Sequence, residues 1–111
     1  MKIKFWATLA GLFLAVAMPL HAADLPSYHL TIKDGKYTPG TVEIPAGQKI
    51  KLVVNNEGPG PEEFESSDLN REKIIQAGKT AEIIIGPLKA GTYNFIGEFH
   101  PETAKGQIIA K

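Results

Sequence analysis

The chain has 111 residues, with 12 Lys and Arg, 12 Asp and Glu, and no cysteine. This length suits one domain, and the absence of cysteine excludes disulfide bonds. The balanced charge argues against nucleic acid as a partner, because phosphate binding needs a basic face.

The first 22 residues have the order of regions that signal peptidase recognises. Lys2 and Lys4 give a positive start, residues 5–20 are uncharged and almost wholly apolar, and small residues follow. We therefore predict a secretory signal peptide over residues 1–22, cleaved after Ala22 or Ala23, and a mature exported domain over residues 23–111. The alternative is an uncleaved membrane anchor, for which the apolar run is short of the about 20 residues of a bilayer span.

Cleavage would change the chemistry that the chain offers. It removes both methionines, the single tryptophan and one of the three histidines, so that only His29 and His100 remain. It also removes two of the 12 basic residues and none of the acidic ones. The mature domain is therefore expected to be slightly acidic and to lack any sulfur ligand.

The mature part reads as short strands separated by turn residues. Asp34-Gly35 is a strong turn pair, and residues 56–61 (NEGPGP) form a loop that cannot pair in a sheet. No stretch has convincing helical periodicity. We predict an all-β, two-sheet, antiparallel Greek-key sandwich of about seven or eight strands. The predicted strands cover residues 28–33, 41–44, 49–55, 62–66, 73–75, 80–85, 92–99 and 105–110.

No enzyme motif is evident in the mature part. It has no G-x-S-x-G elbow, no phosphate-binding loop and no dinucleotide-binding glycine pattern. His29 lies on the polar face of the strand over residues 28–33, and we expect it to be exposed. Hydrolase and nucleotide-binding functions are therefore poorly supported.

One group of residues could carry chemistry. His100 lies between Glu98 and Glu102 at the end of a predicted buried strand, and the acidic segment 62–65 follows the Pro/Gly loop. Loops at one end of a sandwich could bring them together, and one imidazole with two or three carboxylates makes a divalent-metal site. On spacing alone, a solvent-exposed or hydrogen-bonded histidine with solvated acids is the more common outcome.

The mature chain resembles the cupredoxins, and most closely the small cupredoxin-like domains of periplasmic ferrous-iron uptake systems. The order of the matching segments is that of the family. The residues that carry the resemblance are LTIKDG (30–35), TVEIPAG (41–47), VNN (54–56), EEFE (62–65), GTYNF (91–95), FHP (99–101) and KG (105–106).

The resemblance also implies where a metal would bind. Family cupredoxins hold copper with a His, then Cys-x-x-His, then Met. These positions fall on Glu62, Gly97, His100 and near Thr103 or Ala104, so only His100 is retained. Without the thiolate, a blue-copper centre is excluded.

A harder nitrogen and oxygen site is the remaining prediction. By strand alternation, Glu62 faces the site end if Phe64 is in the core, and Glu98 shares a face with His100. The predicted metal ligands are Glu62, Glu98 and His100, with Glu63 and Glu102 in reserve. The ion is copper or iron, since imidazole and carboxylate suit both.

The function predicted from this resemblance is a periplasmic metal-binding protein accessory to ferrous-iron uptake, which assists Fe(II) oxidation. Its partner would be a membrane iron permease or a periplasmic iron-binding protein. One alternative is a metal-free interaction module that docks on such a partner. Another is a ferroxidase enzyme with its own turnover, although the sequence names no dioxygen site.

Overall fold

The computed structural model describes residues 24–111. The predicted signal peptide over residues 1–22 and its cleavage site therefore lie outside the described residues. Within residues 24–111, no helix has the length and apolar character needed to cross a bilayer.

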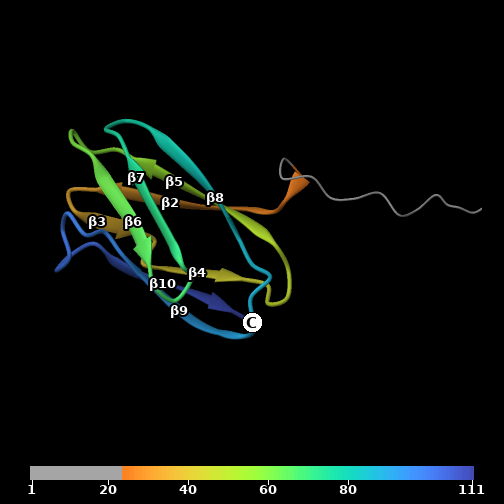
Figure 1. Cartoon of the computed structure of the whole chain (residues 1–111). Helices are drawn as coiled ribbons and strands as arrows, with labels where there is room; N and C mark the ends of the chain where they lie inside the picture. The colour runs from red at the N-terminus through yellow and green to blue at the C-terminus, as the bar shows by residue number, and fades with distance from the viewer. Residues whose placement is uncertain (1–23) are drawn as a thin grey trace, which may run out of the picture.

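The described part is an all-β sandwich of nine strands in two sheets (Figure 1). One sheet has four strands in the order β3-β2-β5-β8, and the other has five in the order β4-β10-β9-β6-β7. The strands are β2 (Ser27–Lys33), β3 (Lys36–Thr38), β4 (Thr41–Ile44), β5 (Ile50–Asn56), β6 (Glu62–Ser66), β7 (Arg71–Ile75), β8 (Thr80–Ile85), β9 (Gly91–Ile96) and β10 (Lys105–Ala110).

The predicted fold class is confirmed, with two differences in detail. The three-residue strand β3 brings the number of strands to nine. The sheets are mixed and not purely antiparallel, because β2 pairs with β5 and β4 pairs with β10 in parallel. The parallel pairs arise because the chain crosses between the sheets, from β3 in the four-stranded sheet to β4 in the five-stranded sheet.

Alternating apolar residues of both sheets fill the space between them. In β2, Leu30 and Ile32 are fully buried while His29 is exposed, as the alternation predicts. Three aromatic rings from different strands meet in this core: Tyr37 lies edge-on to Phe64 and Phe95, whose ring centroids are 5.0 Å apart. Phe64 anchors β6, and this anchoring fixes which residues of β6 face inward.

Three loops meet at the end of the sandwich opposite the C-terminus. They join β2 to β3, β5 to β6 and β9 to β10 (Figure 1). This end carries the residues to which the sequence assigns a metal site.

Candidate functional site

Asn56 organises the loop between β5 and β6. It is 2% exposed. Its side-chain amide donates hydrogen bonds to the carbonyls of Gly60 (2.8 Å) and Ile75 (2.9 Å), and its side-chain oxygen accepts one from the Gly58 amide (2.9 Å). Pro59 and Pro61 have no backbone N–H to donate, so the loop cannot pair in a sheet. The hydrogen bonds of the Asn56 side chain hold the loop in place instead, and β6 begins directly after it at Glu62.

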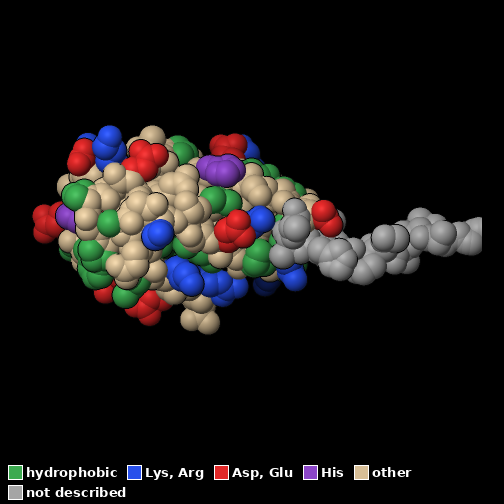
Figure 2. Space-filling view, turned by 90° about the horizontal axis from the view of Figure 1, so that it is seen from above, with side chains coloured by type: hydrophobic (Ala, Val, Ile, Leu, Met, Phe, Trp, Pro, Cys, Tyr) green, Lys and Arg blue, Asp and Glu red, His purple; other side chains and the backbone are tan. Residues whose placement is uncertain are grey.

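Glu62 and His100 meet at the loop end. The His100 Nδ1 atom lies 3.0 Å from Glu62 Oε1. The Glu62 side chain is 7% exposed, whereas that of His100 is 47% exposed. Both line a cavity of about 360 Å³ beside Asp34 and the Pro59–Pro61 segment. In the space-filling view, a histidine stands beside acidic side chains at the end away from the grey trace (Figure 2).

The first turn of the domain holds the imidazole in place. Gly35 has φ of +71°, and a Cβ atom there would lie 3.0 Å from His100 Cγ. The backbone can therefore approach the ring closely only because residue 35 has no side chain. The Thr103 hydroxyl donates a hydrogen bond to the Gly35 carbonyl (2.6 Å) and ties the turn that contains His100 to the same place.

Glu98 does not join His100, because the strand ends earlier than predicted. β9 stops at Ile96, and residues 97–104 form a compact turn. The Gly97 amide donates to the Ala104 carbonyl (2.8 Å), and the Ala104 amide donates to the His100 carbonyl (2.8 Å). The two-residue alternation that would place Glu98 and His100 on one face therefore does not apply.

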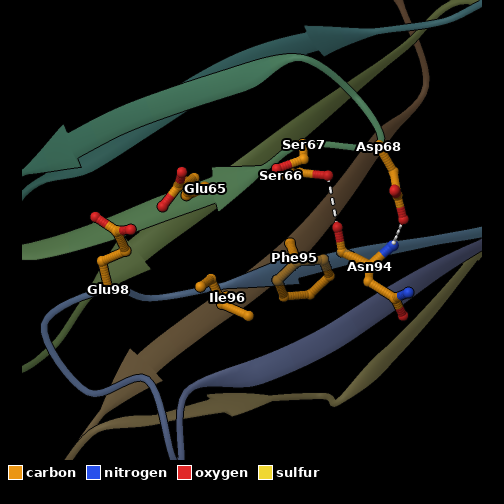
Figure 3. Close-up of a pocket in the computed structure, with 8 residues that line it drawn as sticks. All are labelled: Glu65, Ser66, Ser67, Asp68, Asn94, Phe95, Ile96 and Glu98. Atoms are coloured by element: carbon orange, nitrogen blue, oxygen red, sulfur yellow. Dashed lines mark hydrogen bonds between the residues drawn. The ribbon is translucent and has the colours of Figure 1, made fainter.

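Glu98 instead faces β6. It lines a cavity of about 330 Å³ together with Glu65, and Figure 3 shows the two carboxylates directed into the same space. Glu102 is exposed in the turn. Of the predicted ligands, the structure brings together Glu62 and His100, and it places Glu98 and the reserve ligand Glu63 elsewhere.

Glu63 lies in a carboxylate cluster on the outer face of the five-stranded sheet. Carboxylate oxygens of Glu63, Glu65 and Glu72 lie within 4.8 Å of one another. Among the described residues, this is the only group of three or more His, Asp or Glu side chains with ligand atoms so close. We define Glu63, Glu65, Glu72 and Glu98 as the outer-face cluster.

The electrostatics of the cluster reflect burial and repulsion. Burial raises the pKa of Glu63 to about 7, and a hydrogen bond with the Glu72 carboxyl and the charges of Glu98, Glu72 and Glu65 add to the effect. Burial also raises the pKa of Glu65, with the Glu98 carboxyl adding to the effect. Loss of water raises the pKa of the Tyr37 hydroxyl, which donates a hydrogen bond to the Glu63 carbonyl (2.7 Å).

The residues present do not fit a blue-copper ion but do fit a harder one. A Cβ atom on Gly97 would lie 3.0 Å from both the Ala104 Cβ and the Glu63 carbonyl oxygen, so this position has no room for a thiolate. The 3.0 Å between Glu62 Oε1 and His100 Nδ1 is a hydrogen-bond distance. It also suits two neighbouring ligands of one ion in a tetragonal or octahedral site, since bonds of about 2.1 Å at right angles place them about 3 Å apart. Two protein ligands leave the remaining positions to water or substrate.

The functional site predicted from the sequence did not include Gly35, Asn56 and Glu72. The Asp34-Gly35 turn pair indicated a turn, but contact with His100 depends on a loop distant in sequence. Glu72 joins the cluster through the pairing of β6 with β7, in which it lies opposite Glu65. Alternation within 62–66 predicted that Glu63 and Glu65 share a face, but not which strand lies beside them.

Comparison with known proteins gives concordant results. A family model described as a cupredoxin-like domain matches residues 6–110. An uncharacterized protein of Rickettsia prowazekii (strain Madrid E) is 41% identical over 106 residues, covering 88% of this chain and 85% of that protein.

Solved structures with a similar fold include three cupredoxins. A reduced auracyanin from Roseiflexus castenholzii matches with a TM-score of 0.64 at 13% identity, covering 77% of this chain and 96% of its own. Amicyanin from Paracoccus versutus matches with a TM-score of 0.61 at 20% identity, covering 89% and 96%. A purple cupredoxin from Nitrosopumilus maritimus matches with a TM-score of 0.58 at 21% identity, covering 75% and 98%. These likenesses concern the fold.

Proposed function

Because the chain belongs to the family of cupredoxin-like domains, we propose that it is a periplasmic protein that binds copper or iron through Glu62 and His100. It would serve ferrous-iron uptake and assist Fe(II) oxidation. The observation that carries the proposal is the 3.0 Å approach of His100 Nδ1 to Glu62 Oε1 at the loop end. An imidazole and a carboxylate bind Cu(II) and iron alike.

The exposure of the two side chains supports an exchangeable site. Glu62 is held in the fold, while nearly half of the His100 side chain is open to solvent. An ion bound there would be within reach of a partner. The neighbouring Phe99 is 47% exposed and offers an apolar contact beside the site, which suits docking on a membrane iron permease or a periplasmic iron-binding protein.

Metal titration with matched histidine variants tests the site. The apoprotein should bind Cu(II) or Fe(II) at micromolar concentration, measured by calorimetry and by metal analysis after dialysis. His100→Ala should weaken binding by about tenfold or more, and Glu62→Gln should act in the same direction. His29→Ala is the control, because His29 is exposed on β2, away from the loop-end pair. Equal effects of the two histidine variants, or no binding of either ion, would contradict the proposal.

The role in iron uptake needs a test in cells. A strain without this protein should grow poorly under iron limitation. The wild-type gene and the His29→Ala variant should restore growth, whereas the His100→Ala variant should not. Full restoration of growth by His100→Ala would show that any role in iron uptake does not depend on the Glu62–His100 pair.

A metal-free interaction module is the second candidate function. The observation in its favour is that Glu62 and His100 already bond to each other, with no third His, Asp or Glu ligand atom from the described residues within 4.8 Å of both. Thermal melting discriminates the two functions, because an ion that binds only the native state must raise the midpoint. No shift with Cu(II) or iron would favour the metal-free module.

A further inference from the structure

The outer-face cluster gathers four carboxylates without any basic partner. Glu65 and Glu72 lie directly opposite each other on β6 and β7, an arrangement that destabilises a sheet when both side chains are charged. Within residues 24–111, no Lys or Arg nitrogen lies within 4.0 Å of any of the four carboxylates.

Strand alternation explains why the nearby basic residues do not neutralise the cluster. Lys73 lies opposite Phe64 in the β6–β7 register, and Arg71 lies opposite Ser66. Both therefore project from the face opposite to Glu72. The Arg71 guanidinium instead donates hydrogen bonds to the Ile84 carbonyl on β8 (3.1 and 3.3 Å).

The burial of the Glu63 carboxyl is a second observation, beside the gathering of acidic groups, that points to a missing ligand. Although it is on the outer face, it is only 4% exposed. Its Oε1 atom is buried without a hydrogen-bond partner among the described residues, and the same is true of Glu65 Oε1. A buried acceptor without a partner is costly, and each such group in a native fold calls for a water, an ion or a proton.

We propose that the outer-face cluster is a second metal site, one that binds a hard cation through the oxygens of Glu63, Glu65, Glu72 and Glu98. All-oxygen ligands select hard ions such as Ca²⁺ or Mn²⁺ over soft ones. The oxygens of Glu63, Glu65 and Glu72 lie within 4.8 Å of one another. Two oxygens on opposite sides of one ion, each bonded at about 2.4 Å, are the same distance apart. Glu98 closes the site from the turn after β9, across the cavity that it lines with Glu65 (Figure 3).

The second site is distinct from the Glu62–His100 pair. Glu62 and Glu63 are neighbours in sequence but lie on opposite faces of β6, because successive side chains of a strand alternate. The pair contains an imidazole, whereas the cluster contains only carboxylates. The proposal therefore does not depend on metal binding at His100, and each site can fail its test independently.

Terbium(III) is a suitable probe for the cluster, because it prefers oxygen ligands and its luminescence is excited through tyrosine. Tyr37 lies nearby, with its hydroxyl bonded to the Glu63 carbonyl. The purified protein should bind Tb³⁺ saturably, and Mn²⁺ and Ca²⁺ should displace it. Glu65→Gln, Glu72→Gln and Glu98→Gln should each weaken binding by about tenfold or more.

Matched variants distinguish this site from general charge effects. Glu43 and Glu82 are exposed acids that pair with Lys111 and Lys51, so Glu43→Gln and Glu82→Gln should leave Tb³⁺ affinity unchanged. The double variant Glu62→Gln/His100→Ala should also retain Tb³⁺ binding. Loss of binding in that double variant, or in the exposed-acid controls, would overturn the proposal.

Thermal melting shows whether a variant fails to bind because it fails to fold. Without metal, Glu72→Gln should melt at or above the wild-type temperature, because it removes a repulsive charge. At the same concentration, Ca²⁺ or Mn²⁺ should raise the melting temperature of the wild type more than that of Glu72→Gln. Absence of any Tb³⁺, Ca²⁺ or Mn²⁺ effect up to about 1 mM would overturn the proposal.

Discussion

The loop-end pair and the outer-face cluster are both built on β6, but they differ in how charge is balanced. At the loop end, the Glu62 carboxylate is buried against the His100 imidazole. On the outer face, Glu63 is equally buried, and its neighbours are Glu65, Glu72 and Glu98. Glu62 and Glu63 are therefore adjacent in β6, but only the Glu62 carboxylate has a partner that can balance its charge.

This difference teaches that the residue type alone does not define a site in this fold. Strand alternation decides which face a glutamate occupies, and cross-strand register decides its neighbours. The pair suits an ion that accepts nitrogen and oxygen, whereas the cluster suits an ion that takes oxygen alone. Variants that act on one region or on both can test this division.

Phe64→Ala should have the largest effect, because Phe64 anchors the strand that serves both regions. Its ring is fully buried against Tyr37 and Phe95. Removing it should cost about 3–5 kcal/mol in the free energy of unfolding, measured in urea, and should weaken metal binding in both regions.

Ile74→Ala on the neighbouring strand is the matched control for stability alone, since Ile74 lies opposite Glu63 of the outer-face cluster. Ile74 is 53% exposed, so its truncation should change stability by no more than about 0.5 kcal/mol. A small effect of Phe64→Ala, or loss of binding in only one region, would show that the two regions do not share β6 as their support.

Gly35→Ala should affect the loop-end pair alone. The positive φ of +71° should cost about 1–2 kcal/mol with alanine, and the new Cβ would press on the His100 ring. Cu(II) affinity should fall, and the imidazole nitrogen signals of His100 should shift in NMR spectra, while Tb³⁺ binding is retained.

Gly47→Ala separates backbone strain from contact with the ring. Gly47 has φ of +76°, but a Cβ there would have no neighbour within 4 Å. This variant should lose similar stability to Gly35→Ala and keep its Cu(II) affinity. If both variants lose affinity equally, close packing of Gly35 on His100 is not what positions the imidazole.

The fold could be predicted because its strands carry strong local signals. Tyr28, Leu30 and Ile32 alternate with polar residues, and Phe64 fixes the orientation of Glu62 within a five-residue strand. These periodicities, together with the family resemblance, were sufficient to predict the sandwich and the proximity of Glu62 to His100.

The sequence predicted less well where each strand ends and which strand lies beside it. The alternation of 92–99 continues past Ile96, and only the turn closed by Gly97 and Ala104 ends β9 there. In a strand over residues 92–99, Phe99 would share a face with the buried Phe95, but it lies in the turn and is 47% exposed. Glu98 was therefore expected beside His100, whereas long-range packing directs it to Glu65.

Glu63→Gln should have the smallest effect on stability and should be visible as a change in pH dependence. The pKa of Glu63 is raised from 4.5 to about 7 in the fold, so between these values the folded state binds more protons than the unfolded state. Without metal, the stability contributed by this group is therefore present at low pH and is lost as pH rises through about 7. Because Glu72 and Glu98 are exposed and screened by water, we expect Glu63→Gln to raise the free energy of unfolding by about 1 kcal/mol at pH 8 and by almost nothing at pH 4.5.

Urea unfolding in the presence of a chelator, measured across this pH range, tests the difference, with Glu82→Gln as the exposed control. Identical pH profiles for Glu63→Gln and the wild type would mean that the Glu63 carboxylate is not strained by its neighbours.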